Sequence, residues 1–348
     1  MGFLWNLALG VWSFAEWLPL VLMPAAVLLL RAVVPAWAFM WLLALAIFFA
    51  CKWLTWRRAC RRGSHPPITR SLAYLLAWPG MDARAFLEAP NLKHQAPEKS
   101  QTPNPESRSV NGLSVAVESP FASQRSTLRS LRRLGAWNLE FLWSLEFGVW
   151  SFAAAKTLAG AALILVAARR AFNLPPLLTG WLGMIGVVLF LHFGSFHLLA
   201  LAWQRAGVNA QPVMRSPFLA TSLAEFWSAR WNTAFHVLAQ DLAFRPLARR
   251  CGRTGATIGV FLISGLVHEA VISLPARGGF GLPTAYFIFQ ALGVLAERAR
   301  WGRRLGLGRS FRGWLFALIC AAGPSFWLFH PPFIHQVILP MLQAIGAT

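Results

Sequence analysis

The stretch Ala256–Ser273, ATIGVFLISGLVHEAVIS, decides the fold of this chain. Apart from the adjacent pair His268-Glu269, every residue in it is apolar or small. A transmembrane helix needs roughly 20 consecutive, predominantly apolar residues, and this run approaches that length. Leu177–Trp203 is a second such run, in which two histidines are the only titratable side chains. The chain is therefore predicted to be an all-α, polytopic integral membrane protein.

The overall composition agrees with lipid as the main solvent of the chain. Hydrophobic residues make up 57% of the 348 residues and charged residues only 13%. The mean hydropathy is +0.52. A soluble domain usually carries about 25% charged residues, so this deficit excludes an ordinary soluble globular protein.

The apolar runs predict about eight spans and one amphipathic interfacial helix. The predicted spans lie near residues 3–30, 36–54, 145–168, 177–203, 256–275, 283–297, 313–329 and 331–347. We divide the chain into N-terminal transmembrane helices (1–54), a cytosolic loop (55–144) and a membrane core (145–348). Within the loop, residues 91–126 are rich in Pro, Ser, Gln and charge and are predicted to form a linker.

The net charge of +20 indicates how the chain is oriented in the membrane rather than that it binds nucleic acid. The arginines cluster in short loops beside the spans, notably at 52–62 and 298–312, as basic cytoplasmic loops do. This rule places 52–62, 204–253 and 298–312 together in the cytosol, and it predicts membrane lipids, not nucleic acid, as partners. The four cysteines follow no zinc-site or disulfide spacing, and no metal is expected.

The segment Ser222–Arg250 is predicted to form the amphipathic helix. It opens with the capping-box pattern Ser-Leu-Ala-Glu, and Pro246 sets its expected end. Glu225, Asn232 and His236 recur at helical spacing and form a polar stripe opposite an apolar one. Such a helix suits the membrane interface, with or without chemistry.

The pair His268-Glu269 needs an explanation, because ionisable groups at membrane depth cost a few kcal/mol each on insertion scales. One interpretation is structural: His268 bonds to Ser264, one helical turn earlier. A zinc-protease motif is excluded, since the second histidine of HExxH would fall on Ile272. The other interpretation is a neutral imidazole that takes a proton from a hydroxyl group.

Two motifs in order give the chain a family resemblance. Glu225–Asn232, EFWSARWN, precedes a span containing SGLVHE at Ser264–Glu269. In this the chain resembles the membrane-bound O-acyltransferase superfamily, and within it the plant-type wax synthases and their bacterial relatives. Three further stretches look like that subfamily: Ala77–Asp82 (AWPGMD), His192–His197 (HFGSFH) and Trp327–Pro332 (WLFHPP).

The resemblance implies an acyl-CoA donor, used as co-substrate without a cofactor, and a long-chain alcohol acceptor. It makes His268 the catalytic histidine and Asn232 the second signature residue. As a general base, His268 would activate the alcohol, and Asn232 would orient the thioester or bind the developing oxyanion. Glu269 would set the tautomer of the imidazole. The other residues expected to contact substrate are Glu225, Trp227, Arg230, Trp231, Ser264 and Glu269. Arg230, Arg245, Arg249 and Arg250 are candidates for the CoA phosphates.

Two alternatives stay open at this level. The acceptor of the same reaction could be diacylglycerol or a sterol. A protein of another class, a multi-span transporter of lipids or small molecules, also lines its path with buried polar residues. Chain-length preference and oligomeric state are not indicated. The Ala, Arg and Leu content is typical of a GC-rich bacterium and predicts the cytoplasmic membrane; in a eukaryote the endoplasmic reticulum would be expected.

Overall fold

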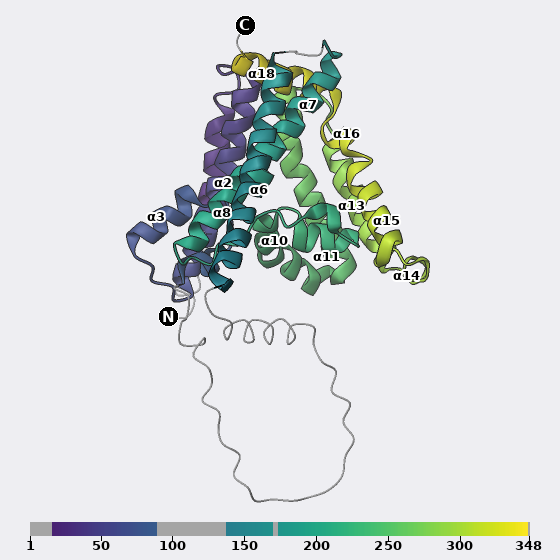
Figure 1. The fold of residues 1–348 in the computed structure, drawn as a ribbon. Helices are drawn as coiled ribbons and strands as arrows, with labels where there is room; N and C mark the ends of the chain where they lie inside the picture. The colour runs from purple at the N-terminus through teal and green to yellow at the C-terminus, as the bar shows by residue number, and fades with distance from the viewer. Residues whose placement is uncertain (1–15, 89–136, 170–172, 347–348) are drawn as a thin grey trace, which may run out of the picture. The chain divides into compact units, whose positions relative to one another are not determined.

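The structure, a computed structural model, describes residues 16–88, 137–169 and 173–346. These residues are helical or irregular, with no strand among them. The chain divides into a larger unit, residues 1–89 and 153–348, and a smaller unit, residues 90–152. The larger unit holds all the elements discussed below, with α6 contributing its residues from 153 onward. Figure 1 shows α3 and α14 at opposite sides of this unit.

The helical elements follow one another with short connections. In the N-terminal half they are α2 (Ala36–Arg61), α3 (Ile68–Ala77), α4 (Ala83–Leu87), α6 (Trp137–Ala168), α7 (Pro176–Val188), η3 (Leu189–Ser195) and α8 (Phe196–Arg205). The central part contains η4 (Pro217–Leu219), α9 (Leu223–Glu225), η5 (Phe226–Arg230), α10 (Thr233–Ala239), η6 (Gln240–Phe244), α11 (Arg245–His268), η7 (Glu269–Ser273) and α12 (Leu274–Ala276). The last elements are α13 (Leu282–Arg298), α14 (Arg300–Leu305), α15 (Ser310–Ala322), α16 (Ser325–Leu328), α17 (Pro331–Phe333), η8 (Ile334–Ile338) and α18 (Leu339–Gly346).

Five helical runs of the described residues are long and apolar enough to cross a membrane. They are Ala36–Arg61, Gly148–Ala168, Pro176–Arg205, Thr233–Ala276 and Ser310–Leu328. The all-α polytopic membrane fold is thereby confirmed. The other three predicted spans fall on shorter helices, Glu16–Leu28, α13 and the run α17–α18, and residues 3–15 lie outside the described residues. The count of eight therefore stays a prediction.

Small residues let helices of the larger unit approach closely. A Cβ on Gly186 of α7 would lie 2.9 Å from the backbone nitrogen of Ile164 in α6. A Cβ on Gly265 of α11 would lie 2.8 Å from the Cα of Thr284 in α13. Close packing of this kind replaces the hydrophobic effect, which is weak between helices in lipid, as the source of helix association. The α11–α13 contact matters most here, because Gly265 lies one turn before His268.

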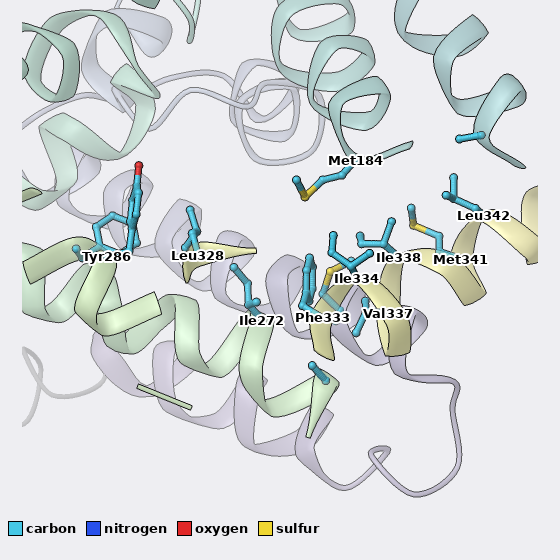
Figure 2. Packing of buried hydrophobic residues seen from close by; sticks show 14 residues of the cluster. Met184, Ile272, Tyr286, Leu328, Phe333, Ile334, Val337, Ile338, Met341 and Leu342 are labelled. Atoms are coloured by element: carbon cyan, nitrogen blue, oxygen red, sulfur yellow. The ribbon is translucent and has the colours of Figure 1, made fainter. Parts of the chain in front are cut away.

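The main apolar core is built around the C-terminal segment. Figure 2 shows Phe333, Ile334, Val337 and Ile338 along this segment, with Met184 of α7 facing them. Buried residues of η7, α13 and α16 also belong to the cluster, among them Ile272, Tyr286, Phe287 and Leu328. Many small dispersion contacts accumulate in such a core and hold the span of His268 against its neighbours.

The first part of the predicted cytosolic loop folds onto the helices of the larger unit. Tyr74 of α3 and Phe86 of α4 are buried in one cluster that Trp203 of α8 joins. Lys52 of α2 is fully buried, donates to the Gly80 carbonyl at 2.7 Å and places its ammonium 3.2 Å from the centroid of the Tyr74 ring. The predicted linker, residues 91–126, lies outside the described residues, and the domain division stays a prediction.

The predicted continuous helix over Ser222–Arg250 is wrong. The chain is extended at Trp231 and left-handed at Asn232 (φ 44°), so α10 starts in a new direction. The cause is tertiary: the Thr233 amide donates to the Val213 carbonyl at 2.9 Å instead of continuing the helix. Pro246 does not end a helix but lies in the first turn of α11, where proline is tolerated. The polar stripe of Glu225, Asn232 and His236 therefore does not exist.

Candidate active site

His268 ends α11 inside a membrane span, with its imidazole in one defined tautomer. Its Nδ1 lies 2.7 Å from the carbonyl oxygen of Ser264. Because that oxygen can only accept, Nδ1 carries the proton and Nε2 carries the free lone pair. The Ser264 hydroxyl donates elsewhere, to the Val260 carbonyl at 3.0 Å. The histidine therefore does bond to Ser264, through the main chain, and the bond leaves its second nitrogen available as a base.

Glu269 bonds to the start of α13 rather than to the imidazole of His268. Its Oε1 accepts from the amide of Gly281 at 2.9 Å, the amide of Thr284 at 3.1 Å and the Thr284 hydroxyl at 3.0 Å. These groups form the first turn of α13, whose amides have no helical acceptor of their own. Its Oε2 is buried without a hydrogen-bond partner among the described residues. Glu269 thus caps α13, and the tautomer of His268 is set by Ser264 instead.

Residues 222–232, here called the signature segment, are attached to the same helix, α13, at its other end. The Ser222 side chain accepts from the Glu225 amide at 3.0 Å, which confirms the predicted helix start. The carboxylate of Glu297 in α13 accepts from the amides of Leu223 at 2.8 Å and Ala224 at 3.0 Å. Three of the orphan amides at this helix start are therefore satisfied by side chains.

An aromatic cluster connects the signature segment with the histidine. The ring of His268 lies 4.4 Å from that of Phe287, and Phe287 lies 5.7 Å from the Trp227 ring. The Trp227 indole is oriented by its Nε1, which donates to Gln290 at 3.2 Å. Phe226 contacts Trp227 at 5.1 Å and stacks on Trp231 at 5.5 Å. Trp227 and His268 thus belong to one aromatic cluster. Phe226 extends this cluster to Trp231, the residue before Asn232.

Asn232 lies at the sharp turn between η5 and α10. Its main-chain amide donates to the Met214 sulfur at 3.3 Å. Its side-chain amide makes no hydrogen bond within the part of the chain that the structure describes. Asparagine is one of the few residues with a side chain that tolerates left-handed backbone. The turn thus presents an amide group that local structure does not use.

Glu225 and Arg230 form an ion pair, and both also bind main-chain groups of the preceding residues Ser216 and Thr221. The Arg230 Nε lies 2.6 Å from Glu225 Oε1, and its Nη1 donates to the Ser216 carbonyl at 3.2 Å. Glu225 Oε2 accepts from the Thr221 amide at 2.8 Å. Partial burial raises the pKa of the Glu225 carboxyl, but the hydrogen bonds from Thr221 and Arg230 outweigh it and hold the pKa below its ordinary value. These contacts use several N–H donors of the Arg230 guanidinium, which was predicted to bind the CoA phosphates.

The structure brings His268, Trp227 and Trp231 into one cluster, whereas Glu225, Arg230 and Glu269 hold main-chain groups. Sequence reasoning missed Phe287, Gln290 and Glu297, all in α13. Gln290 and Glu297 were visible as polar residues seven apart, hence on one face, in an apolar run. The segment η5 and the turn after His268, η7, are both π-helical. π-Helical turns are rare and frequently occur at functional sites.

Comparison with known proteins finds the same region. Residues 210–289 match the Membrane bound O-acyl transferase family. The probable long-chain-alcohol O-fatty-acyltransferase 7 of Arabidopsis thaliana is 30% identical over 146 residues, 37% of this chain and 42% of that protein. The long-chain-alcohol O-fatty-acyltransferase of Simmondsia chinensis is 27% identical over 37% of this chain and 40% of its own length. An acyl-CoA–sterol O-acyltransferase of Arabidopsis thaliana is 29% identical over 20% of this chain and 22% of its own length.

The chain thus covers less than half the length of these relatives. The matched residues 210–289 contain the signature segment, His268 and the first part of α13, which are the elements that the contacts above hold together. On these matches, residues 210–289 are similar to the membrane-bound O-acyltransferase family, and the chain is similar to long-chain-alcohol O-fatty-acyltransferases over 37% of its length.

Proposed function

We propose that this protein transfers a fatty acyl group from acyl-CoA to the hydroxyl of a long-chain alcohol and so makes a wax ester. One observation carries the proposal: the 2.7 Å contact between His268 Nδ1 and the Ser264 carbonyl leaves Nε2 as a base within a membrane span. The similarity to long-chain-alcohol O-fatty-acyltransferases supports the choice of substrates. A cytoplasmic membrane is the proposed location.

The chemistry follows from these groups. The alcohol O–H gives its proton to His268 Nε2 while its oxygen attacks the thioester carbonyl. The tetrahedral intermediate collapses by breaking the C–S bond, and the imidazolium returns the proton to the leaving thiolate, which gives the ester and free CoA. The side-chain amide of Asn232 donates to the oxyanion of the intermediate. No group outside the two substrates and the chain is consumed.

The position of His268 suits substrates that arrive from two phases. It lies 16 residues after the break in α11 at Gly252, hence about 24 Å along the helix from the Arg-rich end. Arg249 and Arg250 are exposed near that end and are the proposed contacts for the CoA phosphates. An alcohol dissolved in the bilayer reaches the histidine from the side, where the span is bounded by lipid.

The test is ester formation by purified protein from acyl-CoA and hexadecanol. His268→Asn is the sharp variant, because its amide nitrogen occupies the place of Nδ1 and keeps the bond to Ser264 while no Nε2 remains. We expect turnover to fall by about 10²–10⁴-fold, the usual contribution of a general base. His335→Ala, which removes an exposed histidine from η8, is the control and should behave as wild type. Wild-type turnover in folded His268→Asn would overturn the mechanism.

A second experiment isolates the amide of Asn232. Glycine accepts the backbone of residue 232 without strain, so Asn232→Gly removes only the side chain. Loss of an oxyanion donor costs about 10²–10³-fold in kcat. The matched control is Ser216→Gly, which makes the same exchange at another left-handed position (φ 47°) nearby in sequence. Equal turnover of the two variants would exclude Asn232 from the chemistry.

A sterol acceptor is the second candidate, favoured by the similarity to an acyl-CoA–sterol O-acyltransferase. Competition between hexadecanol and a sterol for labelled acyl-CoA separates the two acceptors. Predominant sterol ester at equal acceptor concentration would replace the wax ester as the product while leaving the roles of His268 and Asn232 intact.

A further inference from the structure

A cavity of about 210 Å³ opens at the end of α2 that lies away from its arginine-rich end. Arg31, Arg277 and Gln336 supply its polar lining; Val34, Ala36, Phe39 and Pro275 supply the rest. The three polar residues come from three separate places in the chain: the turn after the helix Glu16–Leu28, the end of α12, and η8. These residues are far apart in the sequence, so they line one cavity only because the chain is folded.

The two arginines of this cavity carry uncompensated charge. Other arginines of the described residues form ion pairs with carboxylates, as Arg61, Arg84, Arg230 and Arg245 do. Among the described residues, Arg31 and Arg277 have neither an ion pair nor a side-chain hydrogen bond, and none of the lining residues is acidic. Both arginines are exposed, and an anion bound in the cavity would be attracted by both guanidinium groups.

The wall that carries Arg277 is fixed in place. Arg277 itself is left-handed (φ 50°), and its amide donates to the Leu274 carbonyl at 3.3 Å. Next to it, the buried Ser273 hydroxyl lies 3.3 Å from His330 Nε2, and His330 Nδ1 accepts from the Phe333 amide at 3.2 Å. A site whose backbone is held in this way loses little entropy when a ligand binds.

Size and place indicate the ligand chemistry. Pockets for drug-sized molecules measure roughly 300–1,000 Å³, so this cavity suits a headgroup-sized ligand. Guanidinium groups match phosphate oxygens in bidentate geometry, and basic pockets between membrane helices bind phospholipid headgroups. The cavity lies about 10 Å beyond His268 along its span and at the opposite end of that span from Arg249 and Arg250. It is therefore separate from the proposed CoA contacts.

We propose that Arg31, Arg277 and Gln336 form a binding site for a phosphate group on the membrane face opposite the arginine-rich loops. The phosphate diester of an anionic phospholipid, or free phosphate, supplies this chemistry. The site does not depend on the proposed acyl transfer, because none of its residues takes part in that reaction.

The test is native mass spectrometry of the purified full chain with dioleoylphosphatidylglycerol. We expect one tightly retained lipid, and in Arg31→Gln/Arg277→Gln an affinity lower by roughly 30-fold, which corresponds to about 1 kcal/mol for each arginine. The control Arg303→Gln/Arg304→Gln removes two exposed arginines from α14 and should retain the lipid as wild type does. Helix content by circular dichroism establishes that each variant is folded.

Two further arms identify the source of the phosphate. Inorganic phosphate that displaces the lipid, and itself binds wild type but not Arg31→Gln/Arg277→Gln, would support free phosphate as a ligand. Lipid retention that phosphate does not affect would support the phospholipid. Equal lipid retention by wild type and Arg31→Gln/Arg277→Gln would overturn the site. Equal loss from both double variants would also overturn it, because net charge alone would then explain binding.

Discussion

Replacing Glu269 tests whether its carboxylate acts on the chemistry or on the fold. The contacts assign it to the first turn of α13, where Oε1 accepts from Gly281 once and from Thr284 twice. Glu269→Ala removes this acceptor altogether. Glu269→Gln keeps an acceptor oxygen in the same place while it removes the charge. The two variants therefore separate the hydrogen bonds from the charge.

The expected cost follows from the three donors. Loss of a side-chain cap costs about 1 kcal/mol, and a buried main-chain donor left without an acceptor costs about 1–3 kcal/mol. The Thr284 hydroxyl can rotate to another acceptor and the exposed Gly281 amide can bond to water, so the half-buried Thr284 amide dominates. We expect the free energy of unfolding to fall by about 2 kcal/mol in Glu269→Ala, or roughly 30-fold in the folding equilibrium. Glu269→Gln should lose about 1 kcal/mol, since neutral hydrogen bonds are about half as strong as charge-assisted ones.

The assay pairs stability with turnover in the same preparations. Unfolding midpoints in mixed SDS micelles should rank wild type above Glu269→Gln and Glu269→Ala last. Turnover per folded molecule should stay near wild type in Glu269→Gln. A Glu269→Gln protein as stable as wild type but as inactive as His268→Asn would refute the capping role and return Glu269 to the chemistry.

Three other substitutions test how the site is supported. Lys52→Ala should lower the free energy of unfolding by about 2–4 kcal/mol because the side chain is fully buried, and Lys52→Met, which fills the same space, should lose less in the same denaturation series. Gly265→Ala places a Cβ 2.8 Å from the Thr284 backbone and, by separating α11 from α13, should reduce turnover by about 10²-fold, whereas Gly148→Ala, with open space around it, should have no effect. Glu297→Ala frees the amides of Leu223 and Ala224 and should destabilise the protein by about 1–3 kcal/mol, as unfolding midpoints would report; an unchanged midpoint would exclude the cap.

The sequence was sufficient for the features that depend on local composition. Long apolar runs located the spans, because a helix in lipid must be apolar over about 20 residues. The Ser222 cap was readable because a hydroxyl three residues before an acidic residue marks a helix start. The pair His268-Glu269 was visible because ionisable groups in spans are costly. The site assignment of His268 and Asn232 remains a prediction.

The missed features depend on contacts between distant segments. No glycine or proline marks the break at Trp231-Asn232. The helix is broken because the Thr233 amide donates to the carbonyl of Val213, which lies much earlier in the chain. The partner of Glu269 is the start of α13, which spacing along one helix cannot indicate. Adjacent residues on a helix point about 100° apart, and this geometry already argued against Glu269 as the residue that sets the tautomer of His268.

The attachment of two segments to α13 bears on protein engineering. Glu297 holds the start of the signature segment, Phe287 lies against the His268 ring, and Thr284 binds Glu269, all from one helix. A chimera that joins a foreign 222–232 segment to the native α13 would keep the two main-chain amides for Glu297 but would change the contacts of Trp227 with Phe287 and Gln290. Residues 210–298 contain both sides of these contacts and are therefore the block to exchange in a chimera.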